Sequence, residues 1–124
     1  MKFALTLFLL LFVFSGCTSS SQETSKNIQL ALQWADLHEL PSDAQNVTIE
    51  SKGSAMTREF LLSFSANESS IRKWLSESPG TSHISPEIEG NIEIYHITAS
   101  SGAQFAELTY DTIQIHVQIR VYWS

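Results

Sequence analysis

The most constraining feature of the sequence is a strict alternation of apolar and polar residues near its end. Apolar residues occupy every second position, at Ile113, Ile115, Val117, Ile119, Val121 and Trp123. The residues between them are Gln114, His116, Gln118, Arg120 and Tyr122. Because successive side chains of a strand point to opposite faces, this pattern predicts a strand with one buried and one polar face. The chain is therefore expected to build a sheet that is covered on one side.

Shorter segments supply further strands for this sheet. Alternation favours strands from 46 to 51 and from 57 to 65, with a glycine-containing turn at 52–54 between them. Two strands joined by such a short connection are expected to be antiparallel. Two more strands are expected over 91–99 and 103–110, which gives the sheet about five strands.

The connection before the last strand determines which residues face one another. If Asp111 and Thr112 form a two-residue turn, Tyr110 lies opposite Ile113 on the core side. Glu107 then faces His116 on the polar side of the sheet. This register is a prediction that the strand pairing can test.

One helix is expected between the second and third strands. The spacing of Ser65 and Glu68 is typical of a capping box, which predicts a helix start there. Ile71, Trp74 and Leu75 follow at helical spacing and form one apolar stripe, and Pro79-Gly80 ends the helix. The order β-β-α-β-β-β gives an α+β fold, an antiparallel sheet with one helix packed on one face.

The segment before the first strand gives a weaker signal. The apolar residues between Ile28 and Leu40 fit neither the helical nor the strand period, so a short helix and an extended segment both stay open. Residues 28–124 are expected to form one small domain.

The start of the chain has the features of an export signal. Lys2 precedes the uncharged, apolar run 3–14, which is too short to cross a membrane and matches the apolar region of a cleavable signal peptide. Phe14-Ser15-Gly16-Cys17 resembles the lipobox of bacterial lipoproteins, although Phe14 departs from the usual Leu, Val or Ile. The alternative is an ordinary secretory signal followed by a chance cysteine.

The resemblance to bacterial lipoproteins implies removal of a signal peptide, lipidation and a location at a membrane. It implies that residues 1–16 are removed and that Cys17 carries a lipid that anchors the protein to a membrane. Thr18 stands where an Asp would favour the inner membrane, so the expected location is the outer membrane, facing the periplasm, if the source has two membranes. The Ser-rich segment after Cys17, up to residue 27, is expected to be a flexible tether.

The rest of the chain is similar to small, uncharacterised bacterial lipoproteins. The resemblance rests on the segment Leu40–Val47, on the strand and helix from Phe60 to Leu75, and on a last hairpin that ends in Tyr122-Trp123-Ser124. It implies no activity.

The charge of the chain argues against a nucleic-acid partner, and its cysteine content excludes an intramolecular disulfide. The chain has 7 basic and 13 acidic residues and a formal net charge of -6. Such a protein is repelled by phosphate backbones, so nucleic acid is not an expected partner. Cys17 is the only cysteine, so no intramolecular disulfide can form.

Motifs for catalysis are not apparent in the sequence. The four histidines, at positions 38, 83, 96 and 116, have no metal-binding spacing, although His96 and His116 could converge from separate strands. No serine stands in a nucleophile motif, and no Gly-rich turn could cradle a phosphate. The sequence therefore predicts neither metal nor cofactor, and a protein that is not an enzyme.

The polar side of the last strand is the candidate binding face. His116, Gln118, Arg120 and Tyr122, with Gln114 before them, form a polar ladder, and Arg and Tyr are enriched in binding hot spots. The alternative is a plain solvent face.

The leading interpretation is a lipid-anchored, non-catalytic module that binds another envelope protein, or a toxin in the manner of an immunity lipoprotein. A carrier of small molecules or lipids, with a pocket between helix and sheet, is the alternative function.

Overall fold

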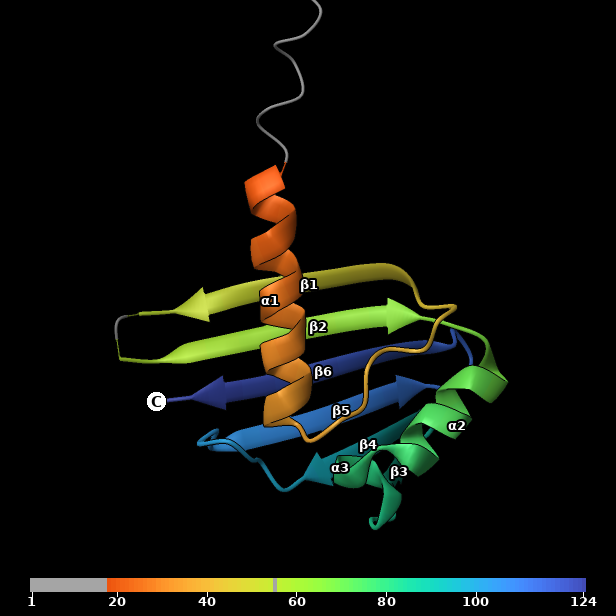
Figure 1. Ribbon diagram of the computed structural model, residues 1–124. Helices are drawn as coiled ribbons and strands as arrows, with labels where there is room; N and C mark the ends of the chain where they lie inside the picture. Colours follow the sequence, from red (N-terminus) through yellow and green to blue (C-terminus); the bar gives the residue numbers. More distant parts are fainter. Residues whose placement is uncertain (1–17, 55) are drawn as a thin grey trace, which may run out of the picture.

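The structure, a computed structural model, describes residues 18–54 and 56–124. The expected signal peptide over 1–16 and the expected lipidation site at Cys17 lie outside the described residues. Figure 1 shows the elements in chain order: α1 (Thr18–Trp34), β1 (Gln45–Gly53), β2 (Arg58–Ser65), α2 (Glu68–Glu77), α3 (Pro79–Ser82), β3 (Glu87–Glu89), β4 (Ile92–Ile97), β5 (Phe105–Asp111) and β6 (His116–Trp123).

In the described part of the chain, the strands form one six-stranded sheet in the order β1-β2-β6-β5-β4-β3. Every neighbouring pair is antiparallel, which confirms the predicted α+β fold with an antiparallel sheet. The expected number of about five strands is corrected to six, because the short β3 lies in a segment expected to be a polar loop. All three of its residues are exposed, so no alternation of apolar residues marks it.

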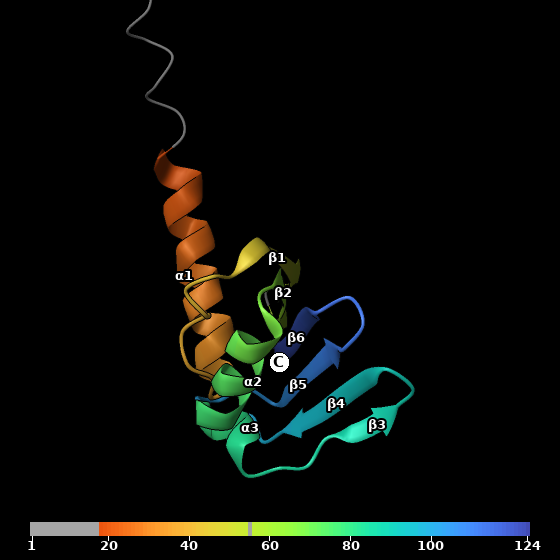
Figure 2. The same cartoon turned by 90° about the vertical axis from the view of Figure 1, so that its right-hand side faces the viewer.

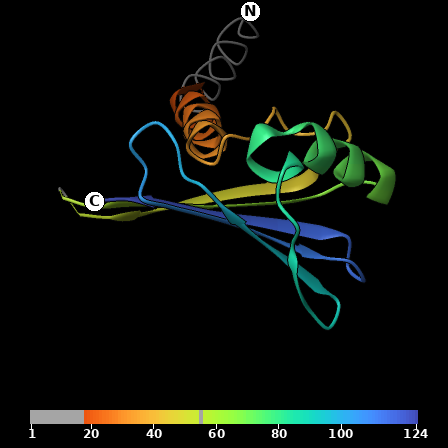
Figure 3. The ribbon, with the colours of Figure 1, turned by 90° about the horizontal axis from the view of Figure 1, so that it is seen from below.

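The expected single helix is corrected to three among the described residues, α1, α2 and α3. They all lie on one side of the sheet, as Figures 2 and 3 show. The other side, called the uncovered face below, has no described element over it. The core lies between the helices and the sheet, and its side chains come chiefly from the three central strands: Phe60, Leu62, Phe64, Leu108, Tyr110, Val117, Ile119 and Val121. Each fully buried side chain of this size contributes about 1.5–3 kcal/mol, so the long alternating strand β6 belongs at the centre, between β2 and β5.

The predicted register of the last hairpin is wrong. Asp111 pairs with His116, and residues 112–115 form a four-residue connection instead of a two-residue turn. The side chain of Asp111 explains the longer connection, because it accepts hydrogen bonds from the backbone amides of Ile113 and Gln114, both at 3.0 Å. Ile113 is consequently 74% exposed, although the alternation had placed it in the core.

The corrected register separates Glu107 from His116. Glu107 lies opposite Arg120, and Tyr110 lies opposite Val117. Relative to the prediction, the partner of Tyr110 moves from residue 113 to residue 117, an even number of positions. The predicted inward and outward directions of the β6 side chains therefore hold, since side chains alternate with a period of two.

The start of α2 is held by a distant residue instead of the predicted capping box. Ser65 ends β2, and Asn67 is the N-cap of the helix. The backbone amide of Asn67 donates to Asp43 Oδ2 at 2.9 Å. The predicted apolar stripe is confirmed, because Ile71, Trp74 and Leu75 are all buried.

Pro79 and Gly80 do not end the helical region completely. They begin the short helix α3, which follows Ser78 directly. The Gly80 amide donates to the carbonyl of Asp36 at 2.7 Å, and a Cβ on Gly80 would lie 2.2 Å from the carbonyl oxygen of Ala35. Only glycine allows the two segments to approach so closely.

Residues 18–27, expected to be a flexible tether, form the first part of α1 in the structure. Residues 22–26 are exposed, and this part of the helix extends past the edge strand β1, as Figure 1 shows. The rest of α1 packs on the sheet through the buried residues Ala31 and Leu32. Because the packed part of α1 already supplies the helix nucleus, adding residues to its start costs little free energy. Ser and Thr are only mildly unfavourable in a helix. Residues 18–27 are therefore described as helix and not as irregular chain.

Candidate functional site

The uncovered face of the sheet contains the four predicted binding residues. His116, Gln118, Arg120 and Tyr122 lie on it, because they alternate along β6 with the buried Val117, Ile119 and Val121. Gln114 is exposed but belongs to the connection before β6. The sequence thus placed the four strand residues together, and the structure shows which residues of neighbouring strands surround them.

Arg120 is at the centre of this face and is held from two sides. Its Nε donates to Glu59 Oε1 on β2 at 2.6 Å. Its guanidinium lies 5.6 Å from the ring centroid of Phe105 on β5. Phe105 in turn stacks on Tyr122, with centroids 5.4 Å apart and planes at 24°. These contacts join an exposed arginine and two half-buried aromatic rings in one cluster, the Arg120 cluster (Glu59, Phe105, Arg120 and Tyr122).

A second cluster lies toward the β3 edge of the uncovered face. His96 Nε2 is 2.9 Å from Glu87 Oε2, and His96 Nδ1 is 3.7 Å from Glu107 Oε2. The hydrogen bond with Glu87 is the main cause of a raised pKa for His96. Sequence reasoning missed this cluster because the strand that carries Glu87 was not predicted.

His116 contacts a serine but does not form a catalytic triad. Its Nδ1 is 3.3 Å from Ser65 Oγ. Asp111, opposite His116, is the carboxylate that would have to orient the imidazole. Its Oδ1 already accepts hydrogen bonds from the side chain of Asn91 and from the amides of Ile113 and Gln114. The Gln114 amide is the main cause of a lowered pKa for Asp111. The carboxylate therefore organises the turn, and no hydrogen bond joins it to His116 among the described residues.

The uncovered face is acidic overall. The strand register and the alternation of side chains place carboxylates on it from four strands, β1, β2, β3 and β5: Glu50, Glu59, Glu87, Glu89, Glu107 and Asp111. Lys52 and Arg120 are the permanent cations that the same register places there. A surface of this charge attracts basic partners and repels acidic ones.

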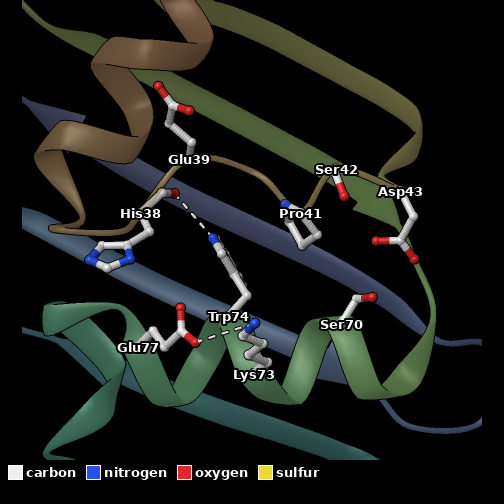
Figure 4. Close-up of a pocket in the computed structure, with 9 residues that line it drawn as sticks. All are labelled: His38, Glu39, Pro41, Ser42, Asp43, Ser70, Lys73, Trp74 and Glu77. Atoms are coloured by element: carbon white, nitrogen blue, oxygen red, sulfur yellow. Dashed lines mark hydrogen bonds and ion pairs between the residues drawn. The ribbon is translucent and has the colours of Figure 1, made fainter.

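A surface groove of about 580 Å³ lies between α2 and the segment that precedes β1 (Figure 4). Trp74 forms its floor and donates from Nε1 to the carbonyl oxygen of His38 at 3.1 Å. Lys73 and Glu77 on its rim lie 3.9 Å apart, and Asp43 is engaged with the amide of Asn67. Figure 4 shows the hydrogen bond of Trp74 with His38 and the ion pair of Lys73 with Glu77.

The space between α2 and the sheet, where the carrier hypothesis places a pocket, is occupied by side chains. Trp74 packs edge-on against Phe64 with centroids 5.3 Å apart, and Ile71 is fully buried beside them. Such packing leaves the groove at the surface and the interior filled.

Arg72 and Glu93 form a two-point ion pair between α2 and β4, with N–O distances of 2.7 and 2.6 Å. The Tyr95 hydroxyl donates to Glu93 at 3.1 Å, and burial raises the pKa of Tyr95 to about 12. The Arg72 guanidinium lies 5.0 Å from the ring centroid of the buried Tyr110. This group joins helix to sheet and is a structural feature.

Two further properties bear on the site. Within residues 18–54 and 56–124, histidine, cysteine, aspartate and glutamate side chains do not gather in threes that could hold a metal ion. No helix in the same ranges has both the length and the apolar character needed to cross a membrane.

Comparison of the chain with protein-family models, with curated proteins and with solved structures gave no match.

Proposed function

We propose that this chain is a non-catalytic, lipid-anchored protein of the bacterial cell envelope that binds another envelope protein through the uncovered face of its sheet. The observation that carries the proposal is the Arg120 cluster. An exposed arginine and two aromatic rings, held in place by neighbouring strands, have the composition of a binding hot spot.

Rigidity favours this face as the binding surface. Its side chains stand on hydrogen-bonded strands, and Arg120 already has a defined direction through its bond to Glu59. A partner would therefore meet an ordered surface, and little side-chain entropy would be lost on binding.

The charge of the uncovered face favours a basic partner. The carboxylates of the uncovered face outnumber its cations, so the complementary surface is basic. A basic envelope protein satisfies this requirement. A basic toxin, neutralised in the manner of an immunity lipoprotein, would satisfy it as well, and identification of the bound protein distinguishes the two.

The proposed location at a membrane rests on the resemblance of Phe14-Ser15-Gly16-Cys17 to a lipobox. A lipid on Cys17 would immediately precede α1, whose first residue is Thr18. At 1.5 Å per residue, the segment 18–27 would hold the domain about 15 Å from the anchor. The proposed location is the outer membrane, on its periplasmic side, if the source has two membranes.

Affinity enrichment with the full-length, tagged chain tests the proposed function. The comparison uses the native chain, Arg120→Ala/Tyr122→Ala, and the control Lys73→Ala/Glu77→Ala, whose residues are exposed on the helical side. We expect the native chain and the control to enrich the same basic protein, and the first variant to lose at least about tenfold of it. Identical enrichment by all three chains would contradict the proposal.

A further inference from the structure

A second site lies at one end of the core, on the helical side of the sheet. Arg58 on β2 pairs directly with Trp123 on β6. Each lies two positions from a buried core residue, Phe60 and Val121 respectively, so both belong to the side that the helices cover. Trp34 ends α1 at the same place. These residues border a cleft of about 320 Å³ together with Ser54, Thr57 and Ser101.

The cleft has a fixed aromatic wall. The ring of Trp34 packs on Phe60, with centroids 5.3 Å apart and planes at 34°. The carbonyl oxygen of Trp34 also accepts a hydrogen bond from the Ser100 amide at 3.0 Å. Trp123 supplies a second indole and is 42% exposed. Flat apolar groups pack favourably against such rings.

Arg58 provides the one charge among the residues that line the cleft. The two other arginines of the chain are each paired with a glutamate at 2.6 Å. Arg58 has no such ion pair within the described residues, and its guanidinium lies 6.0 Å from the ring centroid of Phe60. A guanidinium beside apolar rings and without an ion pair among the described residues is suited to a two-point contact with a carboxylate or a similar anion.

We infer that this cleft binds a small organic anion that carries a flat apolar ring. The ring lies against Trp34 and Trp123, and the acid group receives hydrogen bonds from Arg58. A volume of about 320 Å³ is at the lower end of the range for small-molecule sites, roughly 300–1,000 Å³. The ligand is therefore of the size of a bicyclic aromatic acid. This site is separate from the uncovered face, which lies on the other side of the sheet.

The three tryptophans make the inference directly testable by NMR. In the full-length chain labelled with ¹⁵N-tryptophan, each indole N–H of Trp34, Trp74 and Trp123 gives one signal. Trp74 lies under α2, bonded to His38, and serves as an internal control. The probes are 2-naphthoate and its neutral counterpart, 2-naphthamide.

We expect 2-naphthoate to shift the signals of Trp34 and Trp123 saturably and to leave Trp74 in place. 2-Naphthamide should bind at least about tenfold more weakly, because it lacks the charge-assisted bond. Arg58→Gln should remove this preference for the anion, and Arg58→Lys should retain part of it. Arg120→Gln, which removes an arginine from the uncovered face, is the matched control and should change neither affinity.

Three results would overturn the inference. They are equal binding of the two probes, the same loss of binding in Arg58→Gln and Arg120→Gln, and an absence of saturable shifts at Trp34 and Trp123. An unchanged Trp74 signal in the variants shows that the fold is intact, so failure to bind cannot be attributed to unfolding.

Discussion

The Arg72–Glu93 ion pair makes a quantitative prediction about stability. Arg72→Met removes the guanidinium but keeps an apolar stem that can pack on Tyr110. Glu93 then remains as a carboxylate of which only 13% of the side chain is exposed. Breaking a fully buried pair costs about 3–5 kcal/mol, and breaking an exposed pair costs about 0–1 kcal/mol. Because the Arg72 side chain is 44% exposed, we expect the free energy of unfolding to fall by about 2 kcal/mol at pH 7.

The same ion pair sets a pH dependence with a definite sign. The hydrogen bonds from Arg72 are the main cause of a lowered pKa for Glu93 in the folded chain. The contribution of a group with a lowered pKa is complete above its unfolded pKa, about 4.3 for Glu, and is lost as the pH falls through the folded value. The difference between native chain and Arg72→Met should therefore be largest near neutral pH and should shrink in strong acid.

Urea unfolding, monitored by tryptophan fluorescence at pH 7 and at pH 3, measures both effects. Lys73→Met is the matched control, because Lys73 is the next residue and its pair with Glu77, at 3.9 Å, is exposed. We expect the control to change stability by less than about 0.5 kcal/mol. An effect of Arg72→Met no larger than that of the control would refute the reasoning, and so would an undiminished effect at pH 3.

Two further predictions concern other parts of the fold. The raised pKa of His96 should return toward its ordinary value in Glu87→Gln, because the hydrogen bond with Glu87 is its main cause. The control Glu89→Gln should leave the pKa of His96 raised. An NMR titration of the His96 ring measures both, and equal pKa values in the two variants would contradict the prediction. Gly80→Ala should lower the free energy of unfolding by about 1–3 kcal/mol, because the added Cβ would meet the Ala35 carbonyl oxygen. Ser82→Ala, at an exposed position, is the control. Equal midpoints of urea unfolding for the two variants would show that the close approach at Gly80 is not needed.

The sequence predicted the parts of the fold that follow from local periodicity. The apolar positions of β6 and β2 and the stripe on α2 are buried as expected, because a period of two or of 3.6 residues determines which side of an element is apolar. The period also brought His116, Gln118, Arg120 and Tyr122 to one face. It could not show where β6 begins, because Ile113 fits the same alternation although it lies in the turn that the side chain of Asp111 organises.

The remaining features depend on contacts between distant segments. The contacts of Arg120 with Glu59 and Phe105 exist because β6 lies between β2 and β5, an order that no local pattern encodes. Arg72 has the pattern of a solvent-facing residue of α2, yet it finds Glu93 on a strand near the edge of the sheet. The strand β3 likewise has no pattern of its own and forms by pairing with β4.

In-cell photo-crosslinking most directly tests the claim that the uncovered face binds a partner at the membrane. A photoreactive residue at position 118 lies on that face, and one at position 73 lies on the helical side and serves as the control. We expect one discrete protein adduct, of a basic protein, from position 118 and not from position 73. The adduct should disappear in Cys17→Ser, which removes the proposed lipid anchor. No adduct from a correctly located protein, or the same adducts from both positions, would contradict the account.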